Sequence, residues 1–206
     1  MFLLEEPGKL GEYRVFETNA YVELGEDFDI REAIRVDQRF GARWLAKSRY
    51  ANFTQEFVKV CREYELVTSD RPWWQYVLSG EFFDDFYMTD VIKYRSVSPA
   101  TADIGASFTE FLIHELEYIE PELVFAFGGR AWNALRDRLS LEPISGELEA
   151  TSVHDRHGVL HETNRLVGTM VLPLGHPSPK FRGAQLSHEQ YMQRLASGVR
   201  VWDDQT

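Results

Sequence analysis

The 206-residue chain contains a single cysteine, Cys61, and no apolar run near the length of a membrane-spanning helix. One cysteine excludes an internal disulfide and any zinc or iron–sulfur site built only from cysteines of one chain. A bilayer span needs about 18 consecutive apolar residues, so we expect a protein that does not cross a membrane. The first residues also lack the basic segment, apolar core and cleavage site of a signal peptide, from which we expect a cytoplasmic protein.

Positive charge is scarce as well. The chain has 22 Lys and Arg residues against 33 Asp and Glu residues, which gives a formal net charge of −11. This balance weighs against nucleic-acid binding, because the phosphate backbone attracts Lys and Arg. The charge is unevenly spread, however: residues 1–90 hold 18 acidic and 11 basic residues, whereas residues 168–200 hold four basic residues and one acidic residue. An acidic protein with a basic edge can still steer a polyanion to that edge.

Strand-like and helix-like segments alternate along much of the chain. Hydrophobic residues make up 44% and charged residues 27%, values typical of a globular protein and unlike those of a disordered or fibrous chain. Strand-like runs lie at 2–4, 86–94, 123–127 and 169–174. Because helix-like segments follow the last three runs, we expect parallel strands joined by right-handed crossovers. The sequence therefore predicts an α/β fold, a three-layer α/β/α sandwich with a central, mainly parallel four-stranded sheet.

Periodicity and capping patterns predict where the helices lie. Residues 53–64 place apolar and aromatic side chains on one helical face, which predicts a helix with its aromatic stripe in the core. A capping box from Ser107 to Glu110 predicts the start of a second helix. A closing helix is predicted to begin at Ser187, with Gln190 as the capping partner.

The expected fold also predicts where a ligand binds. In open parallel sheets, ligands bind beyond the carboxyl ends of the strands. This rule selects the segments after Leu4, Asp90, Phe127 and Leu174. Three of these four places carry the unusual residues of the chain, so we expect the functional site at this edge of the sheet.

Four segments carry motifs that point to a family: Glu5–Gly8, Tyr87–Arg95, Pro121–Leu135 and Leu172–Arg182. In this order they resemble segments of the uracil-DNA glycosylase superfamily, and most closely of its compact members with a G-E-A-P-G motif. The first resembles that motif itself, and the second is similar to the family's Y-I-T-N-V-V-K-x-R strand. The third is similar to P-x-x-I-V-x-L-G-x-x-A-x-x-x-L, and the fourth to V-x-P-T-x-H-P-S-x-x-x-R.

The resemblance implies an enzyme that hydrolyses the N-glycosidic bond of a deaminated or damaged base in DNA. It implies a single domain over residues 1–206, in which residues 27–80 match nothing in the family and are expected to be a helical insertion. No cofactor is expected, because the iron–sulfur cluster of the nearest branch needs four thiolates and this chain has one. We further expect DNA as the partner and a monomeric state.

The resemblance also assigns catalytic residues. A glycosylase takes its base out of the stack into a pocket, and the departing base becomes negatively charged while the sugar becomes positively charged. His176 matches the family's histidine and is expected to donate a hydrogen bond to the base oxygen. Glu5 matches the Glu of G-E-A-P-G, whereas Glu6 takes the place of an Asp in another branch. Either carboxylate can orient or activate the attacking water, and the sequence leaves the choice open.

Asp90 is the main departure from the family pattern, in which this residue is usually Asn. The Asn amide accepts from uracil N3–H and donates to O4, whereas an ionised Asp only accepts. Asp90 would therefore suit a base that presents an amino group or two N–H donors, or it would have to be protonated through burial. Phe16 is the candidate for stacking on the flipped base, with Tyr13 and Tyr21 as rivals.

The segment after His176 resembles the family's DNA-probing loop. An apolar Phe181 between the cations Lys180 and Arg182 is expected to wedge into the base stack while its neighbours hold phosphates. Ser178 and Lys93 are expected to contact phosphates. The alternative for the loop is an ordinary exposed segment with an anchoring Phe.

Three further interpretations of the chain remain. The spacing of His154, His157 and His161 is compatible with metal ligands on a helix, but Gly158 interrupts it and the segment resembles a hairpin, so we expect no metal. The departure at Asp90 and the net negative charge are also compatible with a catalytically lapsed relative that binds nucleic acid or protein. A third alternative is an enzyme that acts on free nucleosides or nucleotides.

Overall fold

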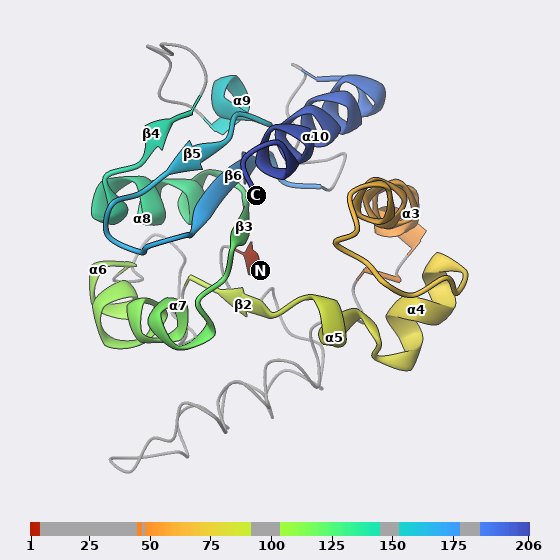
Figure 1. Cartoon of the computed structure of the whole chain (residues 1–206), viewed down its shortest axis with the longest axis horizontal. Coiled ribbons are helices and arrows are strands. Elements are labelled where there is room, and N and C mark those ends of the chain that lie inside the picture. Colours follow the sequence, from red (N-terminus) through yellow and green to blue (C-terminus); the bar gives the residue numbers. More distant parts are fainter. Residues whose placement is uncertain (5–44, 47, 92–103, 145–152, 178–185) are drawn as a thin grey trace.

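The computed structural model describes most of the chain and is shown in Figure 1. Within the described part, no helix is long and apolar enough to cross a membrane. The described residues are 1–4, 45–46, 48–91, 104–144, 153–177 and 186–206.

In the described residues, six strands form one mixed sheet in the order β2-β1-β3-β6-β5-β4. Its parallel part agrees with the predicted α/β sheet, and the bounds of its strands are β1 (Phe2–Leu4), β2 (Met88–Asp90), β3 (Leu123–Phe127) and β6 (Met170–Leu174).

The prediction of a four-stranded sheet is wrong, because two short strands extend it beyond β6. These are β5 (His161–Glu162) and β4 (Glu142–Pro143), which both pair antiparallel. Each has only two residues, too few for the alternation of apolar and polar side chains by which a strand is found in a sequence.

Helices cover both faces of the sheet, which confirms the layered arrangement (Figure 1). Alternate residues of a strand point to opposite faces, so Phe2 joins one core and Leu3 the other. The first core contains residues of α3 (Ser48–Glu63), α4 (Trp73–Ser79), α5 (Phe82–Asp85) and α10 (His188–Asp203). The second contains residues of η3 (Phe108–Leu112), α7 (Ile113–Ile119), α8 (Gly129–Leu139) and α9 (Val153–Arg156), and α6 (Ile104–Ser107) packs against it through Ile104.

The helix predicted from the aromatic stripe at 53–64 is confirmed as α3, which begins earlier, at Ser48. The stripe is in the core: Phe2 lies among five phenylalanine rings, and its centroid is 4.9 Å from that of Phe57. The capping box of the closing helix is also confirmed, since the side chain of Ser187 accepts from the backbone N–H of Gln190 and the side chain of Gln190 accepts in return.

The capping box predicted from Ser107 to Glu110 is wrong. The helix begins at Ile104 and continues through α6, η3 and α7, so Ser107 lies inside it without a capping hydrogen bond. Its hydroxyl instead donates to the carbonyl oxygen of Val91 at 2.7 Å. A tertiary partner has replaced the local one that the Ser-x-x-Glu pattern suggests.

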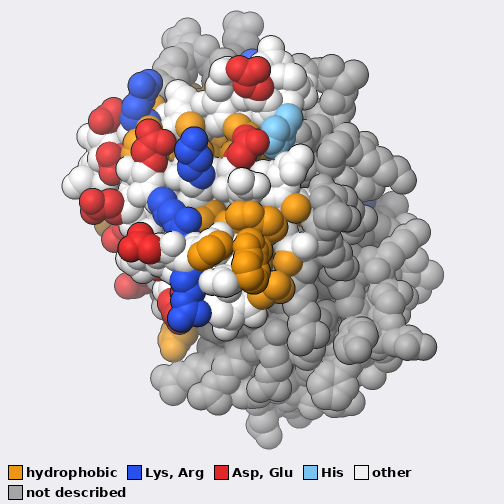
Figure 2. Space-filling view, turned by 90° about the vertical axis from the view of Figure 1, so that its right-hand side faces the viewer, with side chains coloured by type: hydrophobic (Ala, Val, Ile, Leu, Met, Phe, Trp, Pro, Cys, Tyr) orange, Lys and Arg blue, Asp and Glu red, His pale blue; other side chains and the backbone are white. Residues whose placement is uncertain are grey.

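The side of the molecule that carries α3 and α4 shows a hydrophobic area bordered by charged side chains (Figure 2). On α4, Trp74 is 48% exposed and Leu78 is 62% exposed. They are four residues apart and therefore share one side of the helix. These two side chains lie outside the core, in contrast to Tyr76 and Val77 of the same helix, which are buried.

Truncating the aromatic cluster should cost far more stability than truncating the outer side of α4. We expect Phe57→Ala to lower the free energy of unfolding by about 3–5 kcal/mol, because it leaves a cavity among packed rings. The control Leu78→Ala should change it by less than about 0.5 kcal/mol. Urea unfolding followed by circular dichroism measures both, and similar losses for the two variants would contradict this account of the core.

Candidate functional site

The register of the parallel strands brings their carboxyl ends into one row. Leu4 pairs with Asp90, Leu3 with Ala126, and Phe127 with Leu174. The row therefore runs from the end of β2, across β1 and β3, to the end of β6. This is the edge at which we predicted the site from the sequence.

Asp90 and His176 lie at the two ends of this row. Asp90 is the last residue of β2, and His176 is the second residue after β6. Three strand spacings separate β2 from β6, which amounts to about 14 Å between backbones. At this separation the two residues stand at opposite ends of the row, with the ends of β1 and β3 between them, and their side chains are too short to bond to each other.

The imidazole of His176 is partly exposed and lies beside a buried tyrosine. The centroids of the His176 and Tyr50 rings are 6.3 Å apart, and the ring planes are inclined by 54°. Tyr50 lies near the start of α3, so this helix reaches the carboxyl edge of the sheet. The sequence contained a signal for Tyr50, because its spacing from Phe53 and Phe57 places it on the same helical face.

The residues on both sides of Asp90 are bonded to the helix that runs from 104 to 119. On one side, the hydroxyl of Thr89 donates to the Glu115 carboxylate at 2.9 Å, and both residues are buried. On the other side, the Val91 carbonyl accepts from the hydroxyl of Ser107. The Thr89 hydroxyl gives one oxygen of the buried Glu115 carboxylate a hydrogen-bond partner, which offsets part of the cost of burying that group.

A π-helical turn explains how one helix reaches both sides of Asp90. Ser107 and Glu115 are eight residues apart, which in an ideal α-helix of 3.6 residues per turn would separate them by ~80° around the axis. The turn η3 lies between them and takes up one additional residue, which reduces that angle to ~20°. Both side chains therefore face the end of β2.

Two helix N-termini also lie at the carboxyl edge. α8 begins at Gly129, directly after β3, and α10 follows β6. Gly128 connects β3 to α8 with a φ of 92°, which favours glycine, and its N–H donates to the carbonyl of Leu174 at 2.7 Å. The positive ends of helix dipoles favour negative charge at this edge, such as a phosphate or a departing base.

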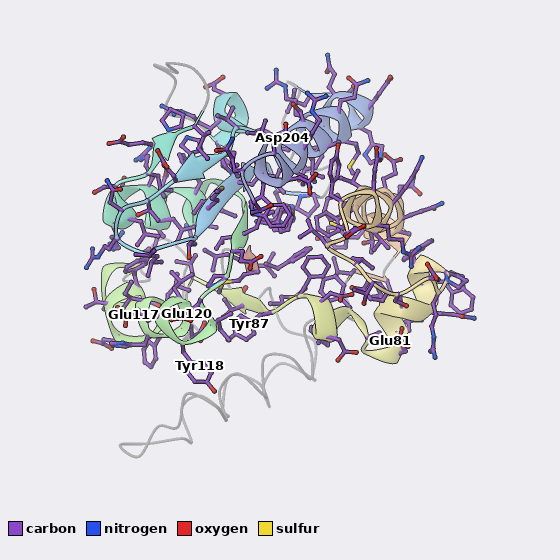
Figure 3. The ribbon with its side chains drawn as sticks, in the orientation of Figure 1. Glu81, Tyr87, Glu117, Tyr118, Glu120 and Asp204 are labelled. Atoms are coloured by element: carbon purple, nitrogen blue, oxygen red, sulfur yellow. The ribbon has the colours of Figure 1, made fainter. Side chains whose placement is uncertain are left out.

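Acidic side chains gather at the opposite edge of the sheet. α7 ends where β3 begins, and this end carries Glu117 and Glu120 (Figure 3). Tyr118, between them, projects outward and is 52% exposed (Figure 3). This part of the negative charge therefore lies away from Asp90 and His176.

Two of the histidines considered for metal binding, His157 and His161, are engaged in different contacts. The Nδ1 atom of His161 donates to the Val159 carbonyl at 2.8 Å, and its Nε2 atom accepts from the Arg156 guanidinium at 3.2 Å. His157 instead bonds with Gly175 and Tyr191. In the part of the chain that the structure describes, no group of three or more His, Cys, Asp or Glu residues is placed to hold a metal ion.

Asp90 and His176 are the predicted site residues that fall in the described ranges. The roles assigned to the other residues stay predictions, because these residues lie outside the described ranges: Glu5, Glu6, Phe16, Lys93, Ser178, Lys180, Phe181 and Arg182. The structure adds residues that the sequence analysis missed or placed in other roles, namely Tyr50, Thr89, Ser107, Glu115, His157 and Tyr191.

Comparison with known proteins identifies one family. The model of the Uracil DNA glycosylase superfamily matches residues 38–199, which include both Asp90 and His176. This is a family of DNA glycosylases, hydrolases of DNA repair. The match begins within residues 27–80, the segment that we predict to be a helical insertion. The division of the chain into domains stays a prediction. Searches among curated proteins and among solved structures gave no significant match.

His161 should make the stability of the protein depend on pH. Burial lowers the pKa of His161 from 6.5 to about 4, and the Arg156 cation also lowers it, against the hydrogen bond to the Val159 carbonyl. The unfolded chain therefore binds a proton more readily than the folded one. The stabilisation is fully present above pH 6.5 and is lost as the pH falls toward 4.

The measurement compares His161→Gln with the wild type by urea unfolding at several pH values. The wild type should lose about 1–3 kcal/mol more than the variant between pH 6.5 and 4. The control is His114→Gln, since the side chain of His114 is 59% exposed; this variant should lose as much as the wild type. Equal losses in all three proteins would contradict the assignment of a neutral, buried His161.

Proposed function

Because this chain belongs to the uracil DNA glycosylase superfamily, we propose that it hydrolyses the N-glycosidic bond of a deaminated or damaged base in DNA. The observation that supports this most is the joint position of Asp90 and His176 at the carboxyl edge of the parallel strands. Asp90 is suited to the hydrogen-bonding edge of a nucleobase, and His176 to the negative charge that appears when the base departs. Both lie in segments that resemble motifs of the family.

His176 stabilises the departing base. When the glycosidic bond breaks, its electron pair remains with the base, and a hydrogen-bond donor aimed at the base oxygen lowers the energy of the transition state. A histidine ring supplies such a donor. The contact with the buried ring of Tyr50 on α3 restricts where the imidazole lies, and a donor that is already oriented acts with little reorganisation.

A carboxylate from the segment after β1 manages the water. Leu4 ends β1 in the row between Asp90 and β3, and Glu5 and Glu6 follow it directly in the chain. One of the two orients or activates the water that attacks the sugar carbon, whose charge becomes positive as the bond breaks. The proposal names both residues because neighbouring side chains usually face different points, so only one of the two is expected to face the water.

Asp90 selects the base. An ionised carboxylate only accepts hydrogen bonds, so it matches a base edge that presents an amino group or two N–H donors. Facing uracil O4, it would bring two acceptors together at a cost of about 1–3 kcal/mol. We therefore propose that the preferred substrate is a lesion other than uracil. Phe16 is proposed to stack on this base.

The remaining family positions are proposed to bind DNA. Phe181 wedges into the base stack between the phosphate-binding cations Lys180 and Arg182. Ser178 and Lys93 add phosphate contacts. These contacts, together with the helix N-termini at the carboxyl edge, offset the net negative charge of the chain where DNA approaches.

A lesion panel tests the activity directly. Oligonucleotides with uracil, hypoxanthine or xanthine are incubated with the protein and then cleaved with alkali at abasic sites. We expect cleavage of at least one lesion, and a loss of about 10²–10³-fold in rate for His176→Ala. Salt-sensitive binding without cleavage of any lesion would instead indicate a lapsed relative that binds nucleic acid. Release of base from free nucleosides alone would indicate a nucleoside enzyme.

The variant Asp90→Asn tests base selection. It should raise the rate on uracil relative to the preferred lesion by roughly 10–100-fold, because the amide both accepts and donates. The control Asp203→Asn, at the exposed end of α10, should leave the ratio of the two rates unchanged. Single-turnover rates on both substrates give the ratio, and an unchanged ratio in Asp90→Asn would remove this residue from base selection.

A further inference from the structure

Gly175, which links β6 to His176, has both of its backbone polar groups bonded to buried side chains. Its N–H donates to Nδ1 of His157 at 2.9 Å, and its carbonyl accepts from the Tyr191 hydroxyl at 2.7 Å. His157 and Tyr191 are each 1% exposed. The two hydrogen bonds hold the peptide planes on both sides of the Gly175 Cα atom. They therefore restrain φ and ψ at a residue that otherwise has the greatest conformational freedom.

The hydrogen-bond partners of His157 determine its tautomer. Because the Gly175 N–H can only donate, Nδ1 of His157 must carry a lone pair rather than a proton. The proton is then on Nε2, which donates to the backbone carbonyl of Tyr191 at 3.0 Å. The centroids of the two rings are 4.1 Å apart. His157 thus connects Gly175 to Tyr191 through two hydrogen bonds and a ring contact.

The residue after His157 packs closely against the backbones of β6 and α10. The next residue, Gly158, donates its N–H to the Pro173 carbonyl of β6 at 3.0 Å. A Cβ atom on Gly158 would lie 2.4 Å from the Arg194 carbonyl oxygen of α10. A Cβ atom on Gly198 would lie 2.7 Å from the Gly158 carbonyl oxygen. Such approaches leave no room for a side chain at either glycine. The segment around Gly158 is therefore packed tightly against β6 and α10.

We infer that His157 and Tyr191 are positioning residues for His176. Tyr191 bonds to the peptide unit that contains the His176 nitrogen, and His157 bonds to the peptide unit before it. The two side chains come from positions 16 residues after and 18 residues before Gly175. The catalytic role of these hydrogen bonds rests on the proposed role of His176, whereas the hydrogen bonds themselves do not depend on it.

Three variants separate the two hydrogen bonds. Tyr191→Phe removes the hydroxyl and keeps the ring. His157→Phe removes both the acceptor and the donor, and His157→Asn offers an amide oxygen near the place of Nδ1. The matched control is Tyr76→Phe, because Tyr76 is also buried and its hydroxyl donates to Asp85 at 2.8 Å, in a different part of the molecule.

The first measurement does not depend on enzymatic activity. In the free protein, NMR spectra that correlate ring nitrogens with carbon-bound protons should show His157 unprotonated at Nδ1 and protonated at Nε2. Tyr191→Phe and His157→Phe should speed hydrogen exchange of the Gly175 amide and shift the ring signals of His176. Tyr76→Phe should change neither. A proton on Nδ1, or His176 signals that stay unchanged in both variants, would overturn the inference.

The second measurement uses single-turnover excision on the lesion that the wild type prefers. Tyr191→Phe and His157→Phe should slow the chemical step by about 10–100-fold, because a small displacement of a catalytic group has effects of that size. Their affinity for DNA should be unchanged, and His157→Asn should recover part of the rate. Folded variants with the wild-type rate would overturn the inference. A wild type that excises no base would contradict only the proposed function, since the NMR measurement still decides the positioning.

Discussion

The candidate site depends on the backbone register of the four parallel strands. β3 pairs with β6 over its whole length, and β1 pairs with β2 and β3, so all four carboxyl ends lie in one row. Burial of both faces enforces this register, since Phe2 packs in one core and Leu3 in the other. A slip of one residue would exchange the two faces. The separation between Asp90 and His176 therefore follows from the core.

Both ends of the row are held by side chains from distant segments. At β2, Ser107 and Glu115 of one helix bond to the residues on either side of Asp90, and a π-turn brings the two side chains to the same side. At β6, His157 and Tyr191 bond to the residue before His176. Sites supported in this way keep their geometry, because the supporting side chains are themselves packed.

The charge of the chain and the charge at the site are different quantities. The formal net charge is −11, which by itself disfavours contact with a polyanion. However, the acidic end of α7 lies at the amino edge of the sheet, whereas the N-termini of α8 and α10 lie at the carboxyl edge. A protein's local potential depends on such an arrangement and not only on the sum of its charges.

The sequence by itself determined the parallel strands, the core stripe of α3 and the capped start of α10, because periodicity and caps act between residues a few positions apart. It also placed Asp90 and His176 at strand ends through their motifs. Only the tertiary structure decided β4, β5, the partner of Ser107 and the task of His157. A two-residue strand has no period, and the Val91 carbonyl and the Gly175 N–H come within reach of these side chains only after distant segments have packed together.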